Sequence, residues 1–177
     1  MSPASLAQLL VAGLIRRGES VATAESLTGG LVAAALTDVP GSSAAVRGGV
    51  VAYRNEVKVS ALGVDALVLA RRGAVDPEVA EQMACGVRER LGSSYGLATT
   101  GVAGPGQSDG KPVGTVFVAV AGPQTSRVQA LSLSGSRSQI RAASVVAVLE
   151  LFAQALDLSR SPTHPGGTVE EGRPAGG

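Results

Sequence analysis

The chain has 177 residues, of which 45% are hydrophobic and 16% charged, and its formal net charge is +1. This length and apolar content suffice for one domain that buries its own core. Nearly balanced charges and few aromatic residues argue against nucleic-acid binding, and no apolar run approaches the roughly 18 residues of a membrane span. The single cysteine, Cys85, excludes an internal disulfide framework and a multi-cysteine metal site. We therefore expect a soluble protein in the reducing cytoplasm.

The first half of the chain alternates helices with short strands. Ser2-Pro3 forms a cap and first turn, and apolar residues at helical spacing predict a helix that ends at Gly18. Asp76-Pro77 opens another amphipathic helix, whose apolar face runs to Leu91. Between these helices we expect strands at 21–24 and 49–53 and helices at 31–36, 55–62 and 65–71.

A glycine-rich loop and a hairpin follow. A strand with the apolar composition of a buried one is expected at 95–100, directly before the loop 101–112. Two further strands, at 113–121 and 127–133, come in succession and are joined by a short turn. Their spacing predicts an antiparallel pair.

The chain ends in a long helix and a polar segment. Ser136 and Gln139 form a capping box, and an apolar helix face then continues to Leu156. Residues 159–177 show no periodicity, which predicts a disordered tail after a domain at 1–158. The order of elements predicts an α/β fold, a three-layer α/β/α sandwich with a mixed, mostly parallel sheet.

Two glycine-rich segments, 25–30 and 100–106, each follow a predicted strand. Ligands of such folds bind at the carboxyl ends of strands, so we expect both segments to line one crevice. The Ser26 hydroxyl would lie where free backbone amides favour negative charge, which suits a nucleophile beside an oxyanion site. Two alternatives remain: Ser26 or Thr28 caps the helix while the glycines permit close packing, or the turn cradles a phosphate.

A nucleophilic serine needs a base, and the single histidine, His164, lies in the predicted tail. The chain has two lysines, Lys58 and Lys111. Tyr53 and Lys58 flank the start of a predicted helix, where both could project toward the crevice. Desolvation there would lower the pKa of the lysine toward that of a useful base. The alternative is a solvated Lys58 and a packed Tyr53.

The second glycine-rich segment and the last helix offer groups for an anion. The loop from Thr100 to Gly106 exposes backbone amides, and Lys111 could add an ammonium. Arg137 and Arg141 oppose the dipole at a helix start, a cost that a bound anion would offset. Ordinary glycine turns and exposed surface arginines are the alternative. Cys85 is expected opposite the apolar face of its helix, among glutamates that raise the pKa of its thiol, and to be inert.

Six short motifs occur in order along the chain: AESLTGG at 24–30, PGSS at 40–43, YRNEVK at 53–58, GAV at 73–75, TGVAGPG at 100–106 and KPVGT at 111–115. Together they resemble the CinA C-terminal domain over roughly residues 5–157, and several motifs in the right order make chance similarity improbable. The sequence departs from the family pattern at Leu27, Arg54 and Ser136, where Cys, Ser and Asp are usual.

The resemblance implies an α/β/α nicotinamide-nucleotide amidase, a hydrolase that converts nicotinamide mononucleotide to nicotinate mononucleotide and ammonia in pyridine-nucleotide salvage. It implies a homo-oligomer that needs no metal or organic cofactor. By motif, Ser26 is the nucleophile, Lys58 the base and Tyr53 an assisting hydroxyl. The groups expected around the oxyanion and substrate are Thr28, Gly29, Gly30, Thr100, Gly101, Gly104, Lys111 and Arg141.

Two other functions remain open. One is a catalytically weak or inactive module that binds a nucleotide for regulation, which tight binding of nicotinamide mononucleotide without ammonia release would identify. The other is an oligomeric interaction protein whose partner contacts the polar face around Cys85.

Overall fold

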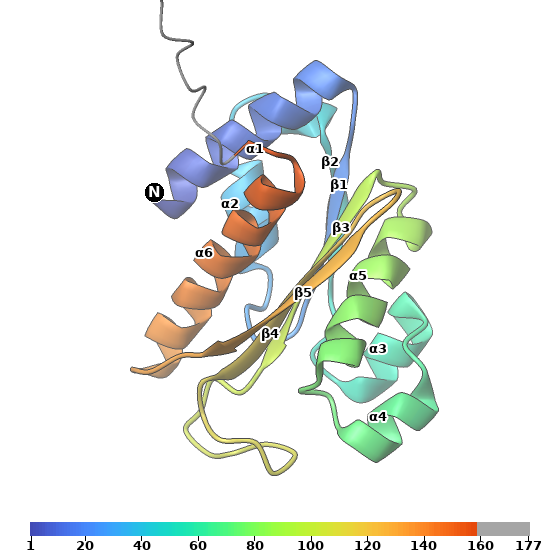
Figure 1. Ribbon diagram of the computed structural model, residues 1–177, viewed down its shortest axis with the longest axis vertical. Coiled ribbons are helices and arrows are strands. Elements are labelled where there is room, and N and C mark those ends of the chain that lie inside the picture. The colour runs from blue at the N-terminus through green and yellow to red at the C-terminus, as the bar shows by residue number, and fades with distance from the viewer. Residues whose placement is uncertain (159–177) are drawn as a thin grey trace, which may run out of the picture.

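The computed structural model describes residues 1–158, in which a five-stranded sheet lies between two layers of helices (Figure 1). The strands are β1 (Val21–Glu25), β2 (Val46–Val51), β3 (Tyr95–Gly101), β4 (Thr115–Ala121) and β5 (Ser126–Ser132). Their spatial order is β2-β1-β3-β4-β5. β1 pairs in parallel with β2 and β3, whereas β4 pairs antiparallel with β3 and β5. The predicted three-layer fold with a mixed, mostly parallel sheet is confirmed, because among the five described strands β4 alone runs opposite to the others.

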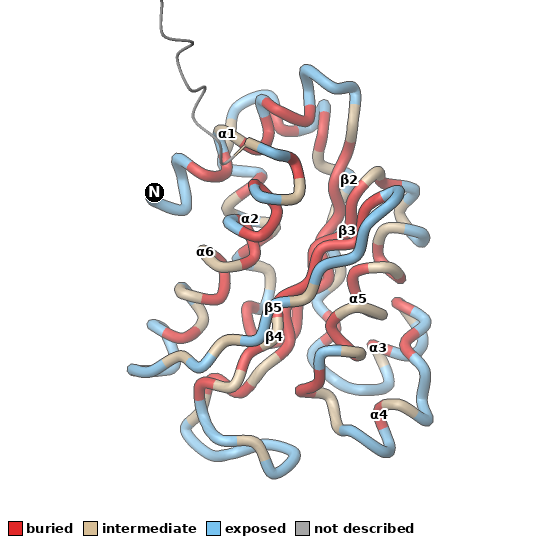
Figure 2. The backbone as a smooth tube through the Cα atoms, viewed as in Figure 1, coloured by how far each residue is buried: buried red, intermediate tan, exposed pale blue. Residues whose placement is uncertain are grey.

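Helices cover both faces of the sheet (Figure 1). One layer contains α1 (Pro3–Arg17), α2 (Leu31–Thr37) and α6 (Arg137–Ala155), and the other contains α3 (Asn55–Leu62), α4 (Ala66–Arg72) and α5 (Pro77–Arg90). A short 3-10 helix, Ser42–Ala44, precedes β2. The interior strand β1 is buried at every position, and Figure 2 shows the buried, red backbone in the middle of the sheet. Strands covered on both faces have no solvent-exposed side, which explains the apolar and small residues at 21–24, before Glu25 ends the strand.

The predicted helix ends are confirmed by their hydrogen bonds. The Ser2 side chain accepts the Ser5 amide at the start of α1, and Gly18 ends that helix with φ +63°. The Ser136 hydroxyl accepts the Gln139 amide while the Gln139 side chain accepts the Ser136 amide, which is the reciprocal capping box. These caps satisfy amides that would otherwise lack acceptors in the first turn.

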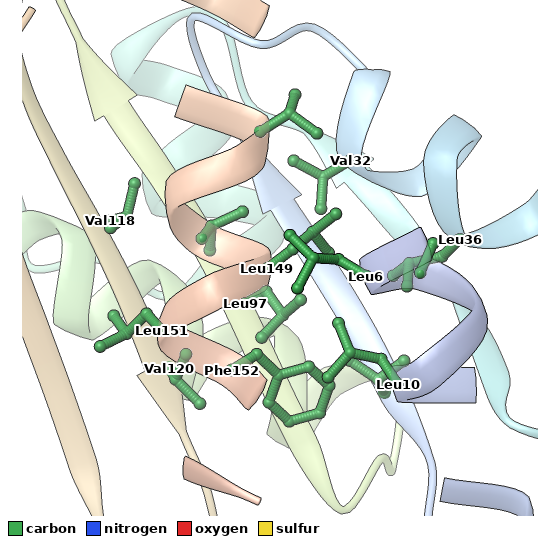
Figure 3. Packing of buried hydrophobic residues seen from close by; sticks show 14 of the residues in the cluster. Leu6, Leu10, Val32, Leu36, Leu97, Val118, Val120, Leu149, Leu151 and Phe152 are labelled. Atoms are coloured by element: carbon green, nitrogen blue, oxygen red, sulfur yellow. The ribbon is translucent and has the colours of Figure 1, made fainter. Parts of the chain in front are cut away.

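The two hydrophobic layers differ in side-chain size. Between the sheet and α1, α2 and α6, large groups such as Leu10, Leu97 and Phe152 pack together (Figure 3). On the other face many of the buried residues are alanines, and α5 approaches its neighbours closely. A Cβ placed on Gly86 would lie 1.8 Å from the carbonyl oxygen of Leu62, so glycine is required there. This close approach fixes the position of α3, which carries Lys58.

Some element boundaries differ from those expected. β2 spans 46–51 and not 49–53, so Tyr53 lies beyond the strand end in the connection to α3. The predicted tail at 159–177 lies outside the described residues. Within 1–158, no helix combines the length and apolar character needed to cross a membrane.

Candidate functional site

A pocket of about 280 Å³ lies beside the carboxyl ends of the parallel strands. Both glycine-rich segments contribute to it, as expected, because the strands that precede them are neighbours in the sheet. The residues that line it are Ser26, Leu27, Tyr53, Asn55, Lys58, Ala74, Val75, Thr100, Gly101, Val102, Ala103, Gly104, Gly106, Ser108, Asp109 and Arg137.

Ser26 is the first residue after β1, is only 9% exposed and lines the pocket. Its amide donates to the carbonyl of Thr99 at 3.0 Å, which ties the turn to the neighbouring strand β3. Among the described residues, its hydroxyl has no hydrogen-bond partner, and neither has the next amide, that of Leu27. A free hydroxyl and the amide that follows it therefore occur together at the pocket.

The carboxylate of Glu25 occupies the N-terminus of α2. It accepts the amides of Gly30 and Val32 at 2.9 and 3.0 Å on one oxygen, and the amide of Ala33 at 2.8 Å on the other. Thr28 adds its hydroxyl at 2.7 Å, and the same hydroxyl lies 2.7 Å from that of Thr99. Glu25 is 1% exposed, so this network is inside the protein.

This network determines where Thr28, Gly29 and Gly30 lie. None of the three lines the pocket. The amide of Gly30 donates to Glu25, and that of Gly29 donates to the Ser26 carbonyl at 3.2 Å. The two glycine amides expected at the oxyanion are thus engaged within the turn. Gly29 and Gly30 adopt φ +59° and +97°, which explains the glycine pair.

Lys58 is buried, with 1% of its surface exposed, and it lines the same pocket as Ser26. Its ammonium donates to the carbonyls of Ala52 at 2.8 Å and Tyr53 at 3.3 Å. Burial lowers the pKa of Lys58 below its ordinary value, while the charges of Asp109 and Glu56 partly oppose that effect. Lys58 is therefore desolvated, as expected, and the alternative of a solvated Lys58 is wrong.

Tyr53 and Arg137 meet at the pocket. Tyr53 is 59% exposed, so it is not packed, and its hydroxyl accepts a hydrogen bond from Arg137 at 2.9 Å. The other guanidinium nitrogen of Arg137 donates to the carbonyl of Gly104 at 2.6 Å. Arg137 thereby connects the segment after β2 with the loop after β3 across the pocket.

Arg141 does not line the pocket. Its guanidinium donates to the carbonyls of Leu27 and Thr28, both at 2.9 Å. It is half-buried and fastens the turn that carries Ser26 to α6. The guanidinium groups of Arg137 and Arg141 donate to the backbone carbonyls of Gly104, Leu27 and Thr28, and Arg137 also donates to the Tyr53 hydroxyl. These acceptors explain how two cations are tolerated near the start of a helix.

The loop after β3 divides into a part at the pocket and a part away from it. Thr100, Gly101 and Gly104 line the pocket, although the Thr100 hydroxyl donates to the Ala74 carbonyl at 2.7 Å. Lys111 lies outside the lining set and closes a tight turn with Ser108 through two backbone hydrogen bonds of 3.2 and 2.9 Å. Within residues 1–158, no group of three His, Cys, Asp or Glu side chains could hold a metal ion.

Cys85 packs against the apolar cluster around α5 and is half-buried, so the expected position opposite the apolar face is wrong. Its pKa is raised, as expected, but burial is the main cause and the charges of Glu81 and Glu89 add to it. A thiol in this environment is a weak nucleophile at neutral pH.

Sequence reasoning did not assign roles to Glu25 and Asp109. A signal for Glu25 was present, because the N-cap of α2 is Gly30, which has no side chain to accept an amide. A carboxylate at the preceding strand end is then a natural acceptor for the first amides. Asp109 gave no such signal, since its contacts are with residues far away in the sequence.

Comparisons with known proteins agree with this fold. A family model for the CinA C-terminal domain matches residues 3–156. A CinA-like protein of Frankia casuarinae is 52% identical over 152 residues, which cover 86% of this chain and 35% of that protein. A CinA-like protein of Desulfotalea psychrophila is 44% identical over 153 residues, covering 86% and 37%. The chain thus spans about a third of the length of these curated relatives.

Two crystal structures show the same architecture. The competence/damage inducible protein CihA from Agrobacterium tumefaciens superposes with a TM-score of 0.84 at 39% identity, covering 88% of this chain and 95% of that one. The competence damage-inducible protein A (ComA) from Klebsiella pneumoniae superposes with a TM-score of 0.85 at 31% identity, covering 90% and 100%. On the family match over nearly the whole described chain, this protein belongs to the CinA C-terminal domain family.

Proposed function

We propose that this protein is a nicotinamide-nucleotide amidase, which hydrolyses the carboxamide of nicotinamide mononucleotide to the carboxylic acid and ammonia. The family resemblance implies this activity. The observation that carries the proposal is that Ser26 and Lys58, a serine with a free hydroxyl and a lysine with a lowered pKa, line one pocket. A serine attacks an amide only when a base accepts its proton, and a lysine in its neutral form is such a base.

The reaction proceeds in two stages. The Ser26 oxygen forms a bond to the carboxamide carbon while its proton passes to the neutral amine of Lys58. Lys58 then gives that proton to the nitrogen as the carbon–nitrogen bond breaks, and ammonia leaves. Water attacks the resulting ester, again with Lys58 as the proton acceptor, and releases the acid together with free Ser26. Tyr53 assists as a hydroxyl at the pocket.

The developing negative charge on the carboxamide oxygen needs hydrogen-bond donors. We assign the amide of Leu27 to this role, because it directly follows the nucleophile and has no acceptor among the described residues. The Gly29 and Gly30 amides are already engaged, so they support the turn and do not bind the oxyanion. The loop from Thr100 to Gly106 then contacts the remainder of the nucleotide.

The test is ammonia release from nicotinamide mononucleotide. Ser26→Ala is expected to lose at least about 1,000-fold in kcat while still binding the nucleotide. Ser43→Ala, at an exposed serine distant from the pocket, is the matched control and should match the wild type. Tight binding by the wild type without ammonia release would replace this proposal by the nucleotide-binding module, and full activity of Ser26→Ala would remove the serine mechanism.

A further inference from the structure

Asp109 occupies a tight turn in the loop after β3. The turn is closed by reciprocal backbone hydrogen bonds between Ser108 and Lys111. Asp109 adopts φ +50° and Gly110 φ +70°, a left-handed pair in which aspartate is one of the few tolerated side chains. The side chain of Asp109 then lines the same pocket as Lys58.

The carboxylate of Asp109 fastens this loop to the connection between α4 and α5. One of its oxygens accepts the amide of Ala74 at 2.8 Å, and the carbonyl of Ala74 accepts the hydroxyl of Thr100 at 2.7 Å. Gly73 makes room for the contact, because a Cβ there would lie 2.7 Å from the Cβ of Asp109 and 2.8 Å from its carboxylate oxygen. Asp109 and Thr100 thus both hold the backbone of Ala74, Asp109 at its amide and Thr100 at its carbonyl.

Asp109 is also the one carboxylate among the described residues that line the pocket. Its charge raises the pKa of Lys58 against the larger effect of burial, and it does so more strongly than Glu56. Glu56 is exposed and paired with Arg54 at 3.2 Å. Arg137 is the other charged residue that lines this pocket, and its guanidinium binds the Tyr53 hydroxyl and the Gly104 carbonyl. The uncharged polar residues of the lining are Ser26, Tyr53, Asn55, Thr100 and Ser108.

We propose that Asp109 is a positioning residue for the catalytic lysine: its carboxylate clamps the loop over the pocket and keeps a negative charge on the wall that Lys58 shares. The proposal rests on Lys58 being the base of the proposed reaction. Asp109 itself takes no proton from the substrate and acts through Lys58. Two variants separate the hydrogen bond of Asp109 from its charge. Asp109→Asn loses the negative charge but keeps an oxygen that can accept the Ala74 amide, whereas Asp109→Ala loses the charge and the acceptor oxygen.

Competitive labelling of the two lysines with acetic anhydride measures this role without turnover. The reagent acylates only the neutral amine, so the pH dependence of labelling reports the titration of each lysine, and peptide mass spectrometry separates Lys58 from Lys111. Free phenylalanine added to the reaction is the reference amine, because Lys111 belongs to the turn that holds Asp109. Asp38→Asn, at an exposed aspartate of the opposite layer, is the matched charge control.

Asp109→Asn is expected to move the labelling midpoint of Lys58 to lower pH by about 0.5 pH unit, because an opposing charge has been removed. The kcat/KM profile should move in the same direction. Asp109→Ala should in addition accelerate Lys58 labelling several-fold, since the loop is no longer fastened. A Lys58 midpoint that is equal in the wild type, Asp38→Asn and Asp109→Asn would overturn the proposal. Because labelling needs no turnover, a wild type that releases no ammonia would reject the amidase alone.

Discussion

Replacing Glu25 by alanine removes the acceptor that organises the turn carrying Ser26. The amide of Val32 is buried and would lose its partner, and an unsatisfied buried donor costs about 1–3 kcal/mol. The amides of Gly30 and Ala33 are partly buried and can regain water, so each contributes less. We expect Glu25→Ala to lower the free energy of unfolding by about 2–4 kcal/mol.

Urea unfolding followed by circular dichroism measures this loss. Glu150→Ala is the matched control, because Glu150 is exposed on α6 and its change should lie within about 0.5 kcal/mol of the wild type. Glu25→Gln should fall between the two, since one acceptor oxygen remains while the new amide group faces other donors. If Glu25→Ala unfolds at the same urea concentration as Glu150→Ala, the carboxylate does not organise this turn.

Three further changes test other parts of the structure. Gly86→Ala should lower the free energy of unfolding in urea by about 1–3 kcal/mol, because its Cβ would meet the Leu62 carbonyl. Gly106→Ala is the control, since no atom lies within 4 Å of a Cβ there, and equal stability of the two variants would contradict the close packing of α5 on α3. Arg141→Gln should cost about 1–3 kcal/mol through its two lost charged hydrogen bonds, and an unchanged urea midpoint would mean that Arg141 does not hold the turn. Burial lowers the pKa of Lys58 below 10.5, so the folded state releases this proton at lower pH than the unfolded chain. The unfolding free energy should therefore rise with pH through that window more steeply than in Lys58→Met, and parallel curves would contradict the burial of a titrating amine.

Most of the fold was predictable because local signals and hydrophobic periodicity agree. The caps at Ser2, Asp76 and Ser136 lie at helix starts, and each accepts an amide of its own first turn. Strand spacing identified the hairpin of β4 and β5 but not the antiparallel pairing of β4 with β3. That pairing depends on which strand edge is free, a property of the assembled sheet.

The site was predictable only in part. Ser26 and Lys58 were expected at one crevice, because both follow neighbouring strands. The hydrogen-bond partners were not predictable, since they join distant segments: Arg141 binds the turn at Leu27, and Asp109 binds the amide of Ala74. For the same reason the glycine amides were assigned to the oxyanion, whereas Glu25 and the turn itself already use them.

The most direct test of the proposed serine mechanism is to trap the covalent intermediate. Wild-type protein mixed with nicotinamide mononucleotide and quenched in acid within the first turnover should carry an acyl group on the peptide that contains Ser26. The adduct should be absent from Ser26→Ala, and it should form far more slowly in Lys58→Met. Ammonia released at the wild-type rate by Ser26→Ala, with no adduct on that peptide in either protein, would contradict the central claim that this serine is made reactive by a buried lysine.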